Sequence, residues 1–238
     1  MNVGVLLAAG ASRRMGRRKS LMRSGSESFV AHGVRHLWQA CDAVVVVLGA
    51  DARRVQPAME QEFVDLFERG RLNADLEQAH RRAAGLEVRF IENREWRKGM
   101  LGSVRVGLRA ALRLGPGAVL VLPVDHPAVK PETVRALAAA MGAALASYGE
   151  APAKRAPRVG AKRGGGRRAT SGFAYALVPR YRRRRGHPVA LSPALARAVA
   201  ADREANDLSD AVRRNARLVG FLDCADAGVV RNRNTPSD

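Results

Sequence analysis

The sequence has few cysteines, few aromatic residues and no long apolar run. Its two cysteines, Cys41 and Cys224, are far apart and lack Cys-x-x-Cys spacing. This pattern excludes a disulfide scaffold or a structural zinc site and indicates a reducing compartment, so we expect a cytoplasmic protein. The apolar runs are shorter than the roughly 18 residues of a membrane span. The first run is followed, not preceded, by arginines, and we therefore expect neither a signal peptide nor a membrane segment.

Acidic residues are also scarce. The chain of 238 residues has 22 Asp and Glu against 41 Lys and Arg, a formal net charge of +19. This excess favours anionic partners and keeps nucleic acid open as a partner at this point. With 47% hydrophobic residues, the chain is long enough for one sizeable core. We expect a single domain over 1–238.

Short, continuous apolar runs alternate with segments of helical periodicity. The runs at 3–10, 43–50 and 118–125 have the composition of strands buried on both faces of a parallel sheet, and 87–93 is a more alternating strand. Helices are predicted after Ser26 or Ser28, from about 101 to 114, and from Pro131 onward. Alternation of strand and helix predicts an α/β fold with a mostly parallel, doubly wound sheet.

Two segments interrupt this alternation. Residues 51–84 are charged and helix-prone, and we expect an inserted, exposed helical segment there. Residues 149–172 are rich in Gly, Pro, Lys and Arg, which is typical of a basic surface loop.

The stretch LLAAGASRRMGRRK at 6–19 runs from an apolar strand into small residues and then into cationic ones. Ala9, Gly10 and Gly16 allow the backbone to close around phosphate oxygens, and Arg14 and Lys19 can neutralise them. The stretch is neither a Walker A loop nor a G-x-G-x-x-G fingerprint. On these residues alone, a basic surface turn is the alternative interpretation.

Two further polar clusters follow apolar runs. Asp125 in LPVDHP ends a predicted strand, where a carboxylate is a suitable oxygen ligand for Mg²⁺ that bridges to phosphates, or simply a turn residue before Pro127. In RRRRGHPVALS, Gly186 and His187 follow four arginines. A single histidine and an arginine run are more often solvated surface groups than catalytic ones.

Taken together, these blocks resemble the MobA-like nucleotidyltransferase family, and within it the molybdenum cofactor cytidylyltransferases of the MocA type. The family's opening signature, Leu-Ala-Ala-Gly-x-Ser-x-Arg-Met-Gly-x-x-Lys-x-Leu, is matched at every fixed position. The matching residues are Leu7, Ala8, Ala9, Gly10, Ser12, Arg14, Met15, Gly16, Lys19 and Leu21. The resemblance continues in family order through ENREWRKGMLGSVRVGL, VLPVDHP, VPRYRRRRGHPVAL and the terminal NRNTPSD.

The resemblance implies a Rossmann-like, three-layer nucleotidyltransferase fold. It implies an enzyme that moves a nucleotidyl group, CMP from CTP, onto the terminal phosphate of a molybdopterin-type cofactor and releases pyrophosphate. Mg²⁺ would be the cofactor, and a molybdenum hydroxylase apoenzyme would be a further partner.

The resemblance also implies roles for individual residues. Arg14, Lys19 and Asp125 would be catalytic; Asp125 and Asn232 would bind the metal; and Gly186, His187 and Pro188 would face the acceptor. The nucleotide would contact the opening signature and the later glycine-serine block, that is, Leu7, Ala8, Ala9, Gly10, Ser12, Arg14, Gly16, Lys19, Gly99 and Ser103. Attack of one phosphate on another needs mainly positioning and charge neutralisation, and no protein nucleophile or general base is expected.

Two departures from the family pattern bear on activity. The family's terminal Asp-x-Asp-Thr-Pro-x-Asp is here Asn232-Arg233-Asn234-Thr235-Pro236-Ser237-Asp238, so an acidic metal ligand is replaced by an amide. An amide oxygen can ligate Mg²⁺ but supplies no charge. Ala8-Ala9-Gly10 resembles the CTP-using branch, a distinction of two residues that leaves GTP and ATP open.

Two alternatives remain at this stage. One is a related nucleotidyltransferase that uses another NTP or a sugar or polyol phosphate acceptor. The other is a catalytically degenerate, nucleic-acid-binding protein, suggested by the charge of +19. Aromatic residues are only 5%, which leaves few stacking platforms for single strands, so nucleic acid is the less favoured partner.

Overall fold

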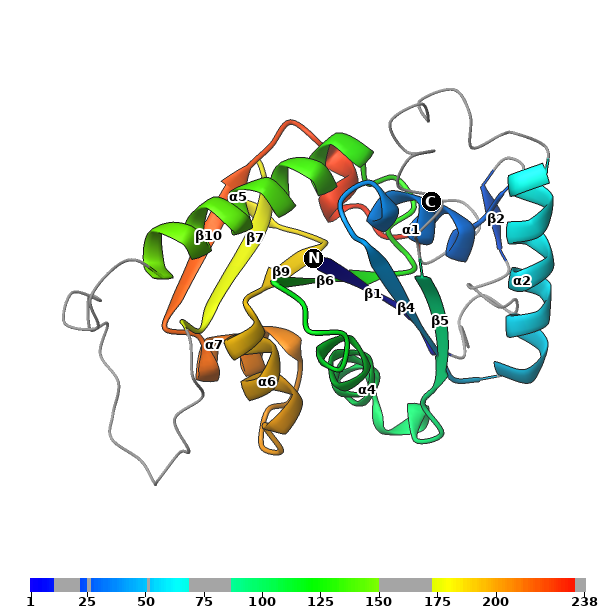
Figure 1. The fold of residues 1–238 in the computed structure, drawn as a ribbon, viewed down its shortest axis with the longest axis horizontal. Coiled ribbons are helices and arrows are strands. Elements are labelled where there is room, and N and C mark those ends of the chain that lie inside the picture. The colour runs from blue at the N-terminus through cyan, green and yellow to red at the C-terminus, as the bar shows by residue number, and fades with distance from the viewer. Residues whose placement is uncertain (11–21, 25–26, 51, 69–86, 150–172, 234–238) are drawn as a thin grey trace.

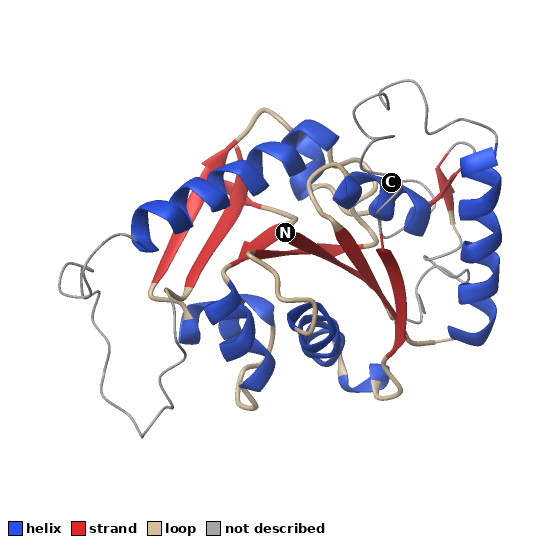
Figure 2. Cartoon of the chain, in the orientation of Figure 1, coloured by secondary structure: helices blue, strands red, loops and turns tan. Residues whose placement is uncertain are grey.

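The computed structural model describes residues 1–10, 22–24, 27–50, 52–68, 87–149 and 173–233. It is a layered α/β structure, in which a central sheet is covered by helices on both faces (Figures 1 and 2). Among the described residues, no helix is both long enough and apolar enough to cross a bilayer.

The sheet has eight strands, with β10-β7-β9-β6-β1-β4-β5 as the order and β8 paired to β7. Their bounds are β1 Asn2–Ala8, β4 Ala43–Leu48, β5 Glu87–Glu92, β6 Ala118–Pro123, β7 Tyr175–Tyr181, β8 Arg184–Arg185, β9 Val189–Leu191 and β10 Leu218–Asp223. β1 is parallel to both β4 and β6, β4 to β5, and β10 to β7, whereas β9 runs antiparallel to β6 and β7. The predicted mostly parallel α/β sheet is confirmed.

The continuous apolar runs form strands because both of their faces are buried. Val3, Val5 and Leu7 of β1 belong to one core with α4 (Met100–Leu112), α6 (Pro193–Ala201) and α7 (Leu208–Asn215). Leu6 and Ala8 belong to the opposite core with α1 (Phe29–Trp38), α2 (Ala52–Glu68) and α5 (Pro131–Gly149). Figure 1 shows these two helical layers on either side of the strands.

The helix starts follow local capping chemistry. Ser28 is the N-cap of α1, and its hydroxyl accepts a hydrogen bond of 3.1 Å from the N–H of Ala31, which decides between Ser26 and Ser28. Ser192 caps α6 in the same way through the N–H of Leu195. Two 3₁₀ turns, η3 (Trp96–Lys98) and η4 (Ala227–Val230), and a short hairpin, β2 (Arg23–Ser24) with β3 (Glu27–Ser28), complete the described elements.

The described part of the insertion at 51–84, α2, is a helix with mostly exposed positions, as expected. Its inner face is not exposed, because Val55 and Met59 are buried against the sheet's second core. Apolar side chains at helical spacing gain more from covering the sheet than from solvent exposure. The remainder of this insertion and nearly all of the 149–172 segment lie outside the described residues.

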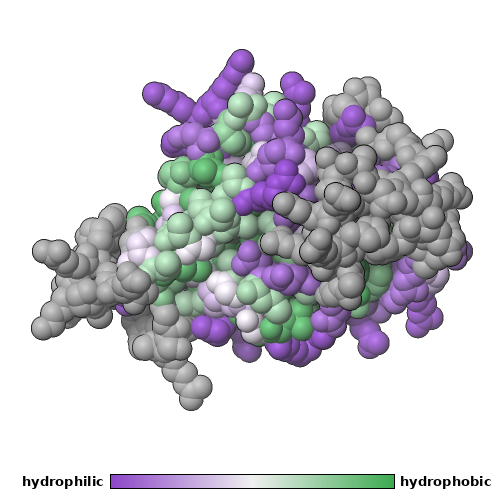
Figure 3. Space-filling view, turned by 45° about the horizontal axis from the view of Figure 1, so that its top comes forward, coloured by the Kyte–Doolittle hydropathy of each residue, from purple (hydrophilic) through white to green (hydrophobic). Residues whose placement is uncertain are grey.

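The outer surface of α5 is apolar but consists of small residues. Figure 3 shows weakly hydrophobic residues along this helix on the visible face, with hydrophilic side chains projecting around it. The exposed positions include Ala136, Ala139 and Ala143. Alanine exposes little apolar area and has the highest helix propensity, which accounts for a stable surface helix here.

Candidate functional site

The C-terminal ends of β1, β4, β5 and β6 lie at the same edge of the sheet, where ligands bind in open α/β structures. After β1, Ala9 is buried, and Gly10 is exposed. The carbonyl of Ala9 accepts a hydrogen bond of 3.2 Å from the N–H of Ala50, which joins the loops that follow β1 and β4. The side chains of Leu7 and Ala8 are buried in the two opposite cores, so these residues offer their backbone to a ligand at this edge.

Four predicted nucleotide-binding residues of the opening loop lie outside the described residues. They are Ser12, Arg14, Gly16 and Lys19. Their assignment remains a prediction.

Asn93 follows β5 and ties the sheet edge to α4. Its amide nitrogen donates a hydrogen bond of 2.9 Å to the hydroxyl of Ser103, and both side chains are buried. Its own N–H donates to the carbonyl of Leu48 at 2.7 Å. Asn93 was not among the predicted site residues, although it opens the block that carried the resemblance. Ser103 is thus fixed at the start of α4 by a buried polar contact.

Gly99, the residue before α4, has a backbone that only glycine adopts without strain. Its φ is 110° and its ψ is 173°. This conformation ends η3 and starts α4 with the N-terminal N–H groups of the helix at the sheet edge. Helix N-terminal N–H groups can donate to anions.

Asp125 lies two residues after β6, and its carboxylate is partly open to solvent, with 22% of the side chain exposed. The backbone at Val124 donates to the carbonyl of Leu7 at 3.0 Å, which places the Asp125 turn beside the end of β1. The carbonyl of Asp125 accepts a hydrogen bond of 2.8 Å from the N–H of Arg233. The structure therefore brings the backbone segment with Asn232 next to Asp125, and the assignment of the two side chains to a metal remains a prediction.

Two histidine rings lie close to this carboxylate and to each other. His126 Nε2 is 3.9 Å from Asp125 Oδ1, and the rings of His126 and His187 are 4.8 Å apart between centroids. Burial lowers the pKa of His187 to about 4, with a further contribution from His126 and an opposing one from Asp125. The ring of His187 is therefore neutral at neutral pH. His126 was not predicted, and its only sequence signal is its position next to Asp125.

The Gly186-His187-Pro188 turn packs closely on η4. The N–H of His187 donates to the carbonyl of Val229 at 2.9 Å, and a Cβ at Gly186 would lie 2.3 Å from that oxygen. Gly186 is therefore required for a close approach of two backbones. The predicted acceptor residues thus share one corner with Asp125 and the chain around Asn232.

The arginines before this turn form an exposed hairpin end. Arg182 and Arg183 have φ values of 47° and 65°, in the left-handed region that arginine rarely adopts. All four arginines of the run at 182–185 are exposed. Arg185 lies over the ring of Phe221 at 5.1 Å from its centroid and directly precedes Gly186, so this positive charge is next to the His187 turn in the chain.

The donor set at this edge fits Mg²⁺ of the kind that is shared with phosphates. In the described part of the chain, no group of three or more His, Cys, Asp or Glu could hold a metal ion. Mg²⁺ often binds through one or two protein oxygens, substrate phosphates and water, and a carboxylate with a neighbouring amide suits that mode. Asp125 and Asn232 are the residues that would hold it.

Comparison with known proteins identifies the fold and the family. The model of the MobA-like NTP transferase domain matches residues 4–218. A curated relative, "Nicotine blue oxidoreductase" of Paenarthrobacter nicotinovorans, is 28% identical over 236 residues, which cover 94% of this chain and 87% of the relative.

Solved structures share the fold over nearly the whole chain. Rv0371c of Mycobacterium tuberculosis has 20% identity and a TM-score of 0.63, with 99% of this chain and 94% of that chain covered. A nucleotidyl transferase from a Methanothermobacter species has 19% identity and a TM-score of 0.62, with 100% and 94% covered. Rv0371c has also been solved as a manganese complex, with 19% identity, a TM-score of 0.56 and 94% and 88% covered. With the nucleotidyltransferase fold and a family match over most of its length, the chain belongs to the MobA-like NTP transferase family.

Proposed function

We propose that this nucleotidyltransferase moves CMP from CTP onto the terminal phosphate of a molybdopterin-type cofactor and releases pyrophosphate. The observation that carries the proposal is the corner at which Asp125, the segment of Asn232 and the Gly186-His187 turn meet beside the end of β1. The N–H of Val124 joins this corner to the Leu7 carbonyl of β1, and the exposed arginines at 182–185 directly precede the Gly186-His187 turn in the chain.

The nucleotide side is assigned from the loop after β1 and from the start of α4. Gly10, with Arg14 and Lys19, would hold the triphosphate, while Ala8 and Ala9 would shape the base site through their backbone. Gly99 and Ser103 would lie beside the nucleotide. The hydroxyl of Ser103 already accepts a hydrogen bond from the Asn93 amide. Ser103 would therefore act mainly by fixing the first turn of α4 beside the nucleotide, and less through a direct contact of its hydroxyl.

The acceptor side is assigned to Gly186, His187 and Pro188. The neutral ring of His187 carries no charge that would compete with Mg²⁺ for the acceptor phosphate. The arginines at 182–185 lie next to it in the chain and would neutralise a multiply charged acceptor. A molybdenum hydroxylase apoenzyme that receives the product would be a further partner.

The reaction brings together two anions, so their electrostatic repulsion contributes to the activation barrier. An oxygen of the acceptor phosphate forms a bond to the α-phosphorus while the bond to the β-phosphate oxygen breaks. Bound Mg²⁺ would neutralise phosphate charge, and Arg14, Lys19 and the N-terminus of α4 would hold the phosphates in line. The acceptor phosphate is already ionised, so no protein group has to remove a proton from it.

The test is pyrophosphate release with Mg²⁺, each of the four NTPs in turn, and molybdopterin present or absent. Asp125→Asn should lower turnover about 100-fold or more, because the carboxylate charge at the metal is lost. Glu60→Gln, at an exposed position of α2, is the matched control and should retain activity. Turnover with a sugar phosphate in place of molybdopterin would keep the reaction class and overturn the acceptor. Turnover with none of the NTPs would overturn the proposed function.

A second candidate function rests on the curated relative, whose printed name is that of an oxidoreductase. In that case the loop after β1 would bind the pyrophosphate of a dinucleotide that carries hydride to an organic acceptor. Oxidation of NADH or NADPH with a redox dye, unaffected by NTPs, would favour this function. Absence of such oxidation, with pyrophosphate release from an NTP, would exclude it.

A further inference from the structure

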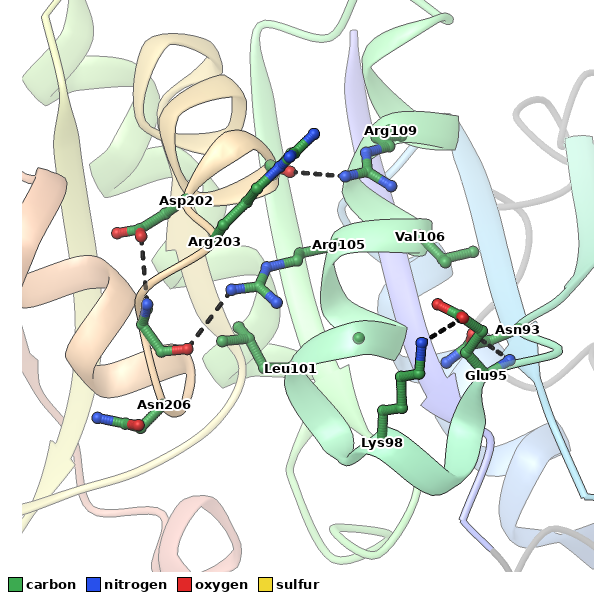
Figure 4. Close-up of a pocket in the computed structure, with 13 residues that line it drawn as sticks. Asn93, Glu95, Lys98, Leu101, Arg105, Val106, Arg109, Asp202, Arg203 and Asn206 are labelled. Atoms are coloured by element: carbon green, nitrogen blue, oxygen red, sulfur yellow. Dashed lines mark hydrogen bonds and ion pairs between the residues drawn. The ribbon is translucent and has the colours of Figure 1, made fainter. Parts of the chain in front are cut away.

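A separate groove of about 270 Å³ lies between α4 and the segment that follows α6. It is lined on one side by η3 and α4 and on the other by the end of α6 and the loop to α7 (Figure 4). Apolar side chains such as Leu101 and Val106 form part of its wall, and the rest is polar, with four cationic side chains, two carboxylates and two amides.

Three arginines converge on this groove from two elements. Arg105 and Arg109 are four residues apart on α4 and therefore lie on the same helical face. Arg105 Nη2 donates to the carbonyl of Ala205 at 3.4 Å, and Arg109 Nη2 donates to the carbonyl of Ala200 at 3.1 Å. Figure 4 shows Arg203 extending from the opposite side toward Arg109.

The positive charge of these arginines is not balanced locally. Among the described residues, Arg105, Arg109 and Arg203 form no ion pair, and the Nε of Arg105 is buried without a hydrogen-bond partner. A buried donor without a partner is costly and marks a place where an acceptor is missing.

The two carboxylates of the groove are already engaged elsewhere. Glu95 pairs with Lys98. Asp202 accepts from Asn215 at 2.6 Å and pairs with Arg214 at 3.2 Å. Burial alone would raise the pKa of Asp202, but hydrogen bonds from Asn215, the backbone and Arg214 lower it to about 2. Neither carboxylate is available to neutralise the three arginines.

We propose that this groove is a second anion-binding site, which takes a small phosphorylated ligand with two or more negative charges. Its volume is at the lower end of small-molecule sites, which suits a phosphate ester or pyrophosphate and not a nucleic-acid strand. Arginine forks match phosphate oxygens, and three of them on two sides can enclose one phosphate group. The inference does not depend on the proposed transferase substrates.

The arginine-lined end of the groove is distinct from the sheet edge, although both involve α4. The helix rises about 1.5 Å per residue, which puts Arg109 roughly 14 Å along the axis from Met100. Ser103 faces the strand side through Asn93, whereas Arg105 and Arg109 reach the α6 segment. A ligand held by these arginines would therefore contact the second half of α4, whereas the other end of the groove reaches Asn93, Lys98 and Leu101 beside the start of the helix.

The ligand could come from two sources with the same chemistry. One is a phosphate species of the transferase reaction, pyrophosphate or the nucleotide itself. The other is an unrelated phosphorylated metabolite that acts on the enzyme from outside its reaction. The binding experiment separates these sources by the probes used.

The experiment is calorimetric titration of the full chain with inorganic pyrophosphate, in EDTA and at low salt. The groove variant is Arg109→Gln with Arg203→Gln, both at exposed positions. The charge-matched control is Arg113→Gln with Arg217→Gln, which are also exposed and do not line the groove. We expect the groove variant to weaken pyrophosphate binding at least about tenfold relative to the control. Equal thermal unfolding midpoints for the two double variants ensure that binding, not folding, is compared.

Three results would decide the proposal and the source. Equal affinity of the groove variant and its control for pyrophosphate, orthophosphate, CTP and glucose 6-phosphate would overturn the proposal. Selective loss of pyrophosphate or CTP binding would support it and identify a ligand from the reaction. Selective loss of glucose 6-phosphate binding would support it and identify an outside ligand. Asp125→Asn should leave pyrophosphate binding in the groove intact even if no NTP is turned over. Failure of the proposed function can therefore be distinguished from failure of the proposed groove site.

Discussion

The N–H of Arg233 donates a hydrogen bond of 2.8 Å to the carbonyl oxygen of Asp125. This contact joins the C-terminal segment to the turn after β6 and places Asn232 near the carboxylate that we assign to the metal. In the family pattern an acidic residue stands in this terminal block, whereas this chain has an amide. The negative charge missing at position 232 leads to the first prediction.

Asn232→Asp should make the enzyme saturate at a lower Mg²⁺ concentration, by several-fold. A second carboxylate adds an anionic oxygen ligand and increases the attraction for a divalent cation. The measurement is pyrophosphate release as a function of Mg²⁺. Ser209→Asp adds the same charge at an exposed position of α7 and is the control. An unchanged Mg²⁺ dependence in Asn232→Asp would show that this residue is not a metal ligand.

Gly99→Ala should destabilise the fold by about 1–3 kcal/mol, because its φ of 110° strains any residue with a Cβ. No atom lies within 4 Å of the added Cβ, so backbone strain is the cause and crowding is not. Urea unfolding at equilibrium measures the change. Gly142→Ala in α5 also has open space but a helical backbone, and it should stabilise by about 0.5–1 kcal/mol. Equal effects of the two substitutions would contradict this explanation.

Gly186→Ala should also destabilise, but through crowding. The new Cβ would lie 2.3 Å from the carbonyl oxygen of Val229, so the turn and η4 must separate. Overpacking of this kind costs about 1–3 kcal/mol. We expect a lower unfolding midpoint together with reduced use of the acceptor. A loss of acceptor affinity at full stability would instead mean that Gly186 contacts the acceptor and has no packing role.

The fold could be predicted where the sequence pattern and burial agree. Apart from Asn2, the runs that became β1, β4 and β6 are continuously apolar because both faces are covered, and that pattern is local. β9 has only three residues, and its antiparallel place between β6 and β7 depends on tertiary pairing. No local periodicity specifies such a strand.

The candidate site was predictable only in part for the same reason. Asp125 ends an apolar run, a signal that the sequence shows directly. The pairing of His126 with His187 depends on how β6 and β9 align, which the sequence does not encode locally. Arg105 and Arg109 belong to an amphipathic helix, where arginines are ordinarily solvated. Their convergence with Arg203 depends on the packing of α4 against α6.

The last prediction concerns stability at acid pH and rests on His36 of α1. Its side chain is buried, with its Nδ1 lacking a hydrogen-bond partner in the described structure. Burial, together with the charges of Arg35 and His32, lowers the pKa of His36 to about 3 against the opposing effect of Asp226. In the unfolded chain its pKa is about 6.5.

Because the unfolded state binds a proton that the folded state excludes, the free energy of unfolding should fall as the pH decreases from about 6.5 toward 3. This residue should have no such effect above about pH 7. By pH 5, protonation of His36 in the unfolded chain should remove about 2 kcal/mol of stability relative to neutral pH, and below about pH 6 the loss approaches roughly 1.4 kcal/mol per pH unit. Urea unfolding of the native chain, His36→Leu and His36→Gln at several pH values measures this loss. Both variants lack the titrating ring and should share the same, shallower pH dependence, whatever their stability at neutral pH. If the native chain lost no more stability than the two variants over this range, His36 would be protonated in the folded state, and the buried environment of α1 would have to admit a charge.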